Sequence, residues 1–223
     1  MSVADVNSRR SERTQVPLTR AHLLRLGELA DVAHASYTRA AGEGGNLAAW
    51  SGRRVAVVLA QGAARHYLHP GLGFGVKDLD VWTFYAHRPA RSLYPGRYEV
   101  HADFGPSSLG RNSYRPPMTA RELIWDNYTG RRVDFLVREL PVRVSTDVDM
   151  LINVLRTWLA RGARERCRHE EKRNSSAHHL AHKAMVWIGT PETLDQAGRP
   201  AWDVDPDFAA AGTAVGGFLE MDT

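Results

Sequence analysis

The stretch KDLDVWTFY at residues 77–85 places two acids at the start of an apolar run. Its β-branched and aromatic residues are typical of a strand. Side chains alternate along a strand, so Asp78 and Asp80 share one face, whereas Leu79 and Val81 point into the core on the other. Two like charges at the edge of a core are costly unless a cation binds them, and Mg²⁺ prefers carboxylate oxygens. The pattern therefore predicts a strand that carries a metal-binding acid pair.

Two further stretches read as strands. RVAVVLA at residues 54–60 is a nearly continuous apolar run, which is typical of a strand buried on both faces. GRRVDFLVREL at residues 130–140 follows a turn signal and carries Asp134 in its middle. If this strand lies beside residues 77–85, the two run about 4.8 Å apart. Three carboxylates would then converge within reach of two cations.

Helical patterns surround these strands. Apolar residues return at three-to-four spacing in residues 17–41, with Thr19 as a plausible N-cap. Other expected elements are a short helix at 63–69 that ends at Pro70, a strand at 97–102, a short helix at 120–127, helices at 147–167 and 176–188, and loops at 71–75 and after Pro191. Alternating strands and helices indicate an α/β (α+β) fold, with a mixed sheet flanked by helices and additional C-terminal helices.

Composition limits the class of protein. Of the 223 residues, 43% are hydrophobic and 24% are charged, which excludes a wholly disordered or fibrous chain. No run of 18 apolar residues is present and residues 1–16 form a polar, flexible leader, so no membrane partner and a cytoplasmic location are expected. Cys167 is the single cysteine, so no intrachain disulfide forms. The net charge of +4 comes mostly from arginine and is compatible with nucleotide or RNA partners.

The order of the motifs resembles the polymerase-β-like nucleotidyltransferase superfamily, including small bacterial members. A strand runs into a small-residue turn at residues 61–64, a short helix follows, and then come one strand with Asp-Leu-Asp-Val and another with Val-Asp-Phe-Leu. The resemblance covers residues 54–140. It implies a nucleotidyltransferase-like core at residues 17–145 and a helical C-terminal part at residues 146–223, packed on the core or forming a lobe of its own.

The resemblance also implies an activity and a site. The activity is Mg²⁺-dependent transfer of a nucleoside monophosphate from an NTP to an acceptor, with two Mg²⁺ ions held by Asp78, Asp80 and Asp134. The acceptor stays open between tRNA, protein and a small molecule. Nucleotide-binding candidates are the turn residues and two lysines: Gly62, Ala63, Ala64, Lys77 and Lys183. The turn departs from the family pattern, because Ala63 stands where a second glycine or a hydroxyl residue is common.

Several alternatives stay open for the acids. Asp134 could instead form an ion pair with one of three arginines: Arg131, Arg132 or Arg138. The pair Asp78/Asp80 could instead be a strand-start or turn acid pair, or could form a salt bridge to Lys77. Asp103 is a rival third acid. Other Asp-x-Asp pairs, at 147/149 and within 203–207, read as a helix start and as a turn.

Other features favour structural roles. His178 and His182 have the i, i+4 spacing of a zinc site, but they lack the intervening glutamate of a metalloprotease and read as a surface cluster. A second function also stays open, namely a catalytically decayed nucleotidyltransferase fold that binds nucleic acid or a protein partner, such as a toxin–antitoxin component.

Overall fold

The computed structural model describes residues 16–40, 50–72, 75–76, 78–87, 101–104, 132–168, 177, 180–181 and 183–204. In chain order, its elements are α2 (Arg20–Ala40), β1 (Arg54–Ala60), α3 (Gln61–Leu68), the 3₁₀ helix η3 (Pro70–Leu72), β2 (Leu79–Ala86), β3 (His101–Asp103), β4 (Arg132–Leu140), α5 (Val148–Arg168), β5 (Ala184–Trp187), the 3₁₀ helix η4 (Pro191–Gln196) and β6 (Pro200–Trp202).

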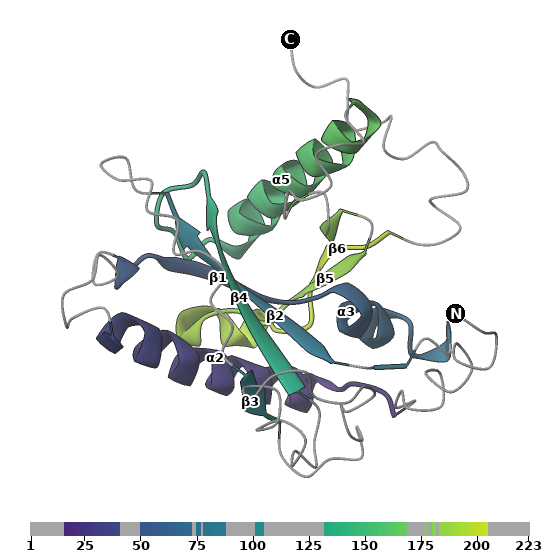
Figure 1. Cartoon of the computed structure of the whole chain (residues 1–223), viewed down its shortest axis with the longest axis horizontal. Helices are drawn as coiled ribbons and strands as arrows, with labels where there is room; N and C mark the ends of the chain where they lie inside the picture. Colours follow the sequence, from purple (N-terminus) through teal and green to yellow (C-terminus); the bar gives the residue numbers. More distant parts are fainter. Residues whose placement is uncertain are drawn as a thin grey trace, which may run out of the picture.

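The described strands form one mixed sheet in the order β3-β4-β2-β1-β5-β6. Strands β2 and β4 run parallel, whereas the other neighbours pair antiparallel. Helix α2 lies along one face of this sheet and α5 crosses the other, with α3 at one end (Figure 1). The expected mixed sheet flanked by helices is confirmed. The likeness to nucleotidyltransferases is not decided by this architecture.

Alternation along the central strands divides the core between the two faces. In β2, Leu79 and Val81 pack with α2 and α3, whereas Trp82 and Phe84 pack under α5. The apolar run of β1 is buried from Val55 onward because helices cover both of its faces. The same alternation turns Asp80 away from Leu79 and Val81, whereas Asp78 precedes the first residue of β2 and its side of the sheet stays a prediction.

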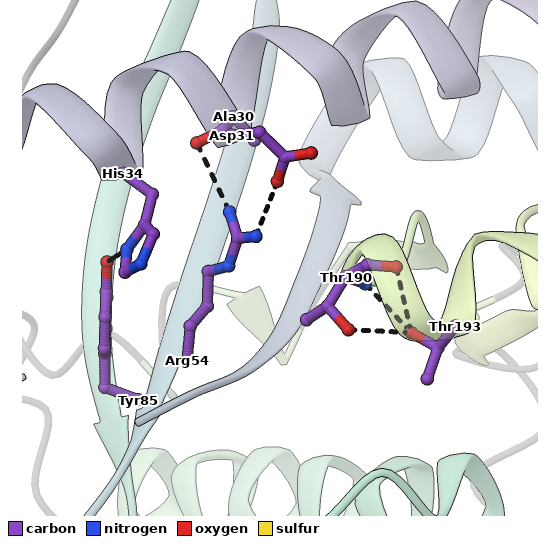
Figure 2. Close-up of polar contacts among 7 residues, drawn as sticks. All are labelled: Ala30, Asp31, His34, Arg54, Tyr85, Thr190 and Thr193. Atoms are coloured by element: carbon purple, nitrogen blue, oxygen red, sulfur yellow. Dashed lines mark hydrogen bonds and ion pairs between the residues drawn. The ribbon is translucent and has the colours of Figure 1, made fainter. Parts of the chain in front are cut away.

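Helix α2 is joined to the sheet by polar contacts as well as apolar ones. Figure 2 shows the Arg54 side chain of β1 reaching α2, where it donates to the Asp31 carboxylate at 2.5 Å and to the Ala30 carbonyl at 3.4 Å. On the same helix, His34 lies 2.7 Å from the Tyr85 hydroxyl of β2. Burial, followed by the nearby positive charge of Arg54, lowers the pKa of His34 from 6.5 to about 4. The imidazole is therefore neutral at physiological pH, and its Nδ1 is hydrogen-bonded to the Tyr85 hydroxyl.

The 3₁₀ helix η4 packs against α2 and is closed by its own cap. The backbone N–H of Thr190 donates to the Thr193 hydroxyl at 2.8 Å, and both side chains are buried (Figure 2). The approach to α2 is close, because a Cβ at Gly27 would lie 3.0 Å from Leu194. This contact fixes the segment that follows β5.

Most of the expected elements agree with the structure. The helix expected at 17–41 is α2, with Thr19 at its start, and the helix expected at 147–167 is α5. The strand expected at 54–60 is β1, and α3 ends before Pro70 as predicted. The strand expected at 97–102 is described only from His101, where β3 begins, and the short helix at 120–127 lies outside the described residues.

The expected helix at 176–188 is wrong in its second half. Residues Ala184–Trp187 are strand β5, which pairs antiparallel with β1. A short apolar run cannot be assigned to helix or strand by periodicity alone. Here the run is a strand because it pairs with β1. After Pro191, where a loop was expected, η4 and the edge strand β6 follow. The segment after residue 146 thus adds two strands to the sheet in addition to α5.

In the part of the chain that the structure describes, no helix is both long enough and apolar enough to cross a membrane.

Candidate functional site

Asp80 and Asp134 lie opposite each other in neighbouring parallel strands. The register of β2 with β4 pairs Asp80 with Asp134, and the register of β1 with β2 pairs Asp80 with Ala60. Ala60 is in turn paired with Met185 of β5. Because directly paired residues share a face, these four residues form one row across the sheet. Two acids from different strands therefore meet at the end of the sheet where β1 runs into α3.

The next row of paired residues on the same face of the sheet is apolar. Leu136, Trp82 and Val58 are paired across the same three strands and are buried under α5. Asp134 is 9% exposed, whereas Asp80 is half-buried. Asp78 is also half-buried and precedes Asp80 by two residues, directly before the start of β2. A carboxylate buried to this degree needs a compensating partner, because desolvation of a charge is costly.

Helix α3 begins directly beside the acids. Ala60 is extended, and no described side chain caps this end of the helix. The first N–H groups of a helix have no partner within the helix, and they attract anions. Ala63 and Ala64 are 2% and 0% exposed in the core beneath the helix, so these two residues can offer a ligand only their backbone. Gly62 is exposed, and a Cβ added there would meet no atom within 4 Å.

Lys183 lies at the same corner. Its ammonium group donates to Gln61 Oε1 at 2.7 Å across a sequence separation of 122 residues. The backbone beside it is fixed too, because Gln61 and Ala184 form an antiparallel bridge that extends the pairing of β1 with β5. Lys183, which was expected on a helix, therefore lies directly before strand β5 and next to the turn at residues 61–64.

Several predicted residues do not enter this description. Lys77, His178 and His182 lie outside the described residues. For Asp103, the structure gives only the backbone register, which pairs it with Arg132 at the end of β3, next to the pairing of His101 with Asp134. The choice between Asp134 and Asp103 as third acid is therefore not settled by the side chains.

The described acids of the other Asp-x-Asp pairs have structural partners. Asp147 accepts from the Met150 N–H at 3.0 Å as the N-cap of α5. Asp149 forms an ion pair with Arg199. Asp203 lies 2.7 Å from His69 Nε2, which ties the end of β6 to the end of α3.

Gln61 is the site residue that sequence reasoning missed. It was read only as part of a small-residue turn, yet it has a φ of 62°, in the left-handed region that non-glycine residues rarely adopt. The available signal was its place between an apolar strand and a glycine, where a sharp strand-to-helix turn demands an unusual backbone conformation.

The arrangement suits an anionic ligand that carries a divalent cation. Among the described residues, no group of three or more His, Cys, Asp or Glu side chains lies close enough to enclose a metal ion. Mg²⁺ is usually held by one or two carboxylates together with substrate phosphates and water, and Asp80 beside Asp134 provides that donor set. Helix N–H groups and a lysine nearby would meet the phosphates.

Comparison of the chain with protein-family models, with curated proteins and with solved structures finds no match. The chemistry of the site therefore rests on its own residues.

Proposed function

We propose that this chain is a Mg²⁺-dependent nucleotidyltransferase, which transfers a nucleoside monophosphate from an NTP to an acceptor. One observation carries the proposal: Asp80 of β2 is paired with Asp134 of β4 on one side and with Ala60, at the start of the α3 turn, on the other. This places a carboxylate pair beside an uncapped helix N-terminus. The resemblance of the strand–turn–helix–strand order to polymerase-β-like nucleotidyltransferases supports the same proposal.

Each group has a role in the proposed reaction. Asp80 and Asp134, together with Asp78 directly before β2, would hold Mg²⁺, which neutralises charge on the triphosphate when bound. The acceptor hydroxyl oxygen forms the new bond to the α-phosphorus, and the bond to the departing pyrophosphate breaks. In this proposal, the Asp134 carboxylate takes the proton of the acceptor hydroxyl as a general base.

The phosphates would be bound by the N-terminus of α3 and by Lys183. The backbone N–H groups of residues 62–64 point out of the α3 N-terminus, where the helix dipole favours negative charge. The Lys183 ammonium, held next to Gln61, adds a positive charge at the same place. Positioning and charge neutralisation are what phosphoryl transfer mainly requires, so no covalent intermediate with the protein is needed.

The proposal is tested by calorimetric titration of ATP, GTP, CTP and UTP with and without Mg²⁺. We expect wild type to bind at least one NTP in a Mg²⁺-dependent manner and Asp80→Asn to weaken that binding roughly 100-fold, as expected for a charged group that holds the cation. Asp195→Asn, the same change at an exposed acid of η4, is the matched control and should bind as wild type does. Equal affinity of wild type and Asp80→Asn would refute the proposal.

A further inference from the structure

Gln61 combines two features that the fold alone does not require. Its backbone adopts a φ of 62°, which a glycine would adopt without strain. Its side chain accepts a hydrogen bond from the Lys183 ammonium at 2.7 Å. A glycine would make the same strand-to-helix turn, but it would leave Lys183 without this acceptor. Gln61 thus combines a strained backbone conformation with a hydrogen bond to Lys183, the one described lysine at this corner.

The contact leaves most of the lysine available. An ammonium group has three N–H donors, and one of them is directed to Gln61 Oε1. The side-chain amide is uncharged, so it orients Lys183 without cancelling its positive charge. A carboxylate at the same place would orient the lysine equally well but would neutralise it. Gln is therefore the side chain suited to holding a lysine ready for an anion.

The strand register places the pair near the carboxylates. Gln61 follows Ala60, which is paired with Asp80, and Lys183 precedes Ala184, which bridges to Gln61. Because β5 lies on the other side of β1 from β2, the Gln61–Lys183 pair lies at the start of α3, across β1 from the carboxylates. Strained backbone is kept where the surrounding structure and function over-determine it, and it clusters at ligand sites.

We propose that Gln61 is a positioning residue, which holds Lys183 over the N-terminus of α3 so that the ammonium binds a phosphate of the Mg²⁺-bound NTP. This inference rests on the proposed nucleotidyltransferase function and deepens it, because it assigns triphosphate recognition to a side chain of the turn as well as to its backbone. Gln61 acts through Lys183 and need not touch the nucleotide.

The test compares nucleotide affinity with stability in the same variants. Gln61→Gly removes both the strain and the contact. We expect its Tm to stay unchanged or to rise by up to about 4 °C, because the left-handed conformation no longer carries a side chain. We expect its affinity for the Mg²⁺-bound NTP to fall roughly 10-fold, which corresponds to the loss of one hydrogen bond to a charged group. A merely structural role would move both quantities in the same direction.

Two further variants make the inference specific. Gln61→Glu keeps an acceptor for Lys183 but adds a negative charge, so its affinity should fall at least as much as that of Gln61→Gly while its Tm does not fall. In a Lys183→Ala background, Gln61→Gly should change affinity less than 2-fold, because the group that Gln61 positions is gone.

The outcomes separate this inference from the proposed function. If Lys183→Ala and Asp80→Asn weaken Mg²⁺-NTP binding but Gln61→Gly binds as well as wild type or better, the role of Gln61 is overturned and the proposed function stands. If Gln61→Gly weakens binding equally with and without Lys183, Gln61 does not act through the lysine. If wild type shows no Mg²⁺-dependent affinity for any NTP, the proposed function and this inference are overturned together.

Discussion

At the scale of single residues, Gly62 lies at the exposed start of α3 although the fold does not require a glycine there. Its φ is not in the left-handed region, unlike those of Gly52 and Gly189. A Cβ would meet no atom within 4 Å, so close packing does not require a glycine either. Glycine within a helix costs roughly 1 kcal/mol relative to alanine. What glycine does provide is unobstructed access to the backbone N–H groups, which the proposed phosphate site uses.

Gly62 therefore supplies a prediction in which stability and binding separate. Gly62→Ala should leave the free energy of unfolding unchanged or raise it by up to about 1 kcal/mol, since alanine favours the helix. Gly62→Leu should also fold, because the space is open, but its side chain should weaken Mg²⁺-NTP binding at least 10-fold. Urea unfolding and calorimetry on the two variants test this. Wild-type affinity in Gly62→Leu would show that phosphates do not approach the α3 N-terminus.

The acids show how far residue-scale reasoning reaches. Alternation predicted one face for Asp78 and Asp80, but only Asp80 lies within the strand, because Asp78 directly precedes the first residue of β2. Asp134 was singled out because a carboxylate inside an apolar strand needs an explanation. Gln61 was missed because its place between an apolar strand and a glycine indicates only a sharp turn, whereas the contact with Lys183 is a property of the folded chain.

At the scale of elements, α2 is fastened to the sheet by a titratable contact. His34 of α2 shares a hydrogen bond with the Tyr85 hydroxyl of β2, and burial together with the Arg54 charge lowers the pKa of His34 to about 4, while Asp31 opposes that shift. In the unfolded chain His34 has an ordinary pKa of 6.5. Below that pH, His34 is protonated in the unfolded chain but stays neutral in the folded protein until the pH approaches 4. The stability from this contact is complete above pH 6.5 and is lost as pH falls toward 4.

This linkage predicts a pH profile that one substitution flattens. Between pH 6.5 and pH 4, wild type should lose about 1–2 kcal/mol more unfolding free energy than His34→Gln, after allowance for solvent screening of a partly exposed ring. Glutamine can accept the Tyr85 hydrogen bond but does not titrate. Urea unfolding at four or five pH values gives both profiles. Parallel profiles for the two proteins would show that His34 does not titrate as the structure indicates.

Elements differ in how well the sequence predicts them. Helices α2 and α5 have 21 residues each, long enough for several turns of apolar periodicity, and both were expected near their observed bounds. Strand β5 has only four residues, all buried, and it was expected to be helical. What decides its conformation is pairing with β1, more than 120 residues earlier in the chain, and that partner is not visible in a local pattern.

At the scale of the whole molecule, the candidate site is assembled from segments that are distant in the sequence. The order of the motifs between residues 54 and 140 was enough to expect acids on neighbouring strands beside a turn, and Lys183 was also a candidate. Its position beside Gln61 needed the tertiary structure, because only the antiparallel pairing of β1 with β5 brings the two residues together. Fold class and candidate residues were thus accessible from the sequence, whereas the contact between Lys183 and Gln61 was not.

We propose that this one corner of the sheet binds a divalent cation together with a nucleotide. Amide NMR with Mn²⁺ in place of Mg²⁺ tests it directly, because a paramagnetic ion broadens the signals of residues near it. In the presence of the NTP that binds best, we predict that the amides of Gly62, Asp80, Asp134 and Lys183 broaden first, while Met150 of α5 and Thr193 of η4 stay sharp. Broadening that spares Asp80 and Asp134, or that begins at α5 or η4, would contradict the account.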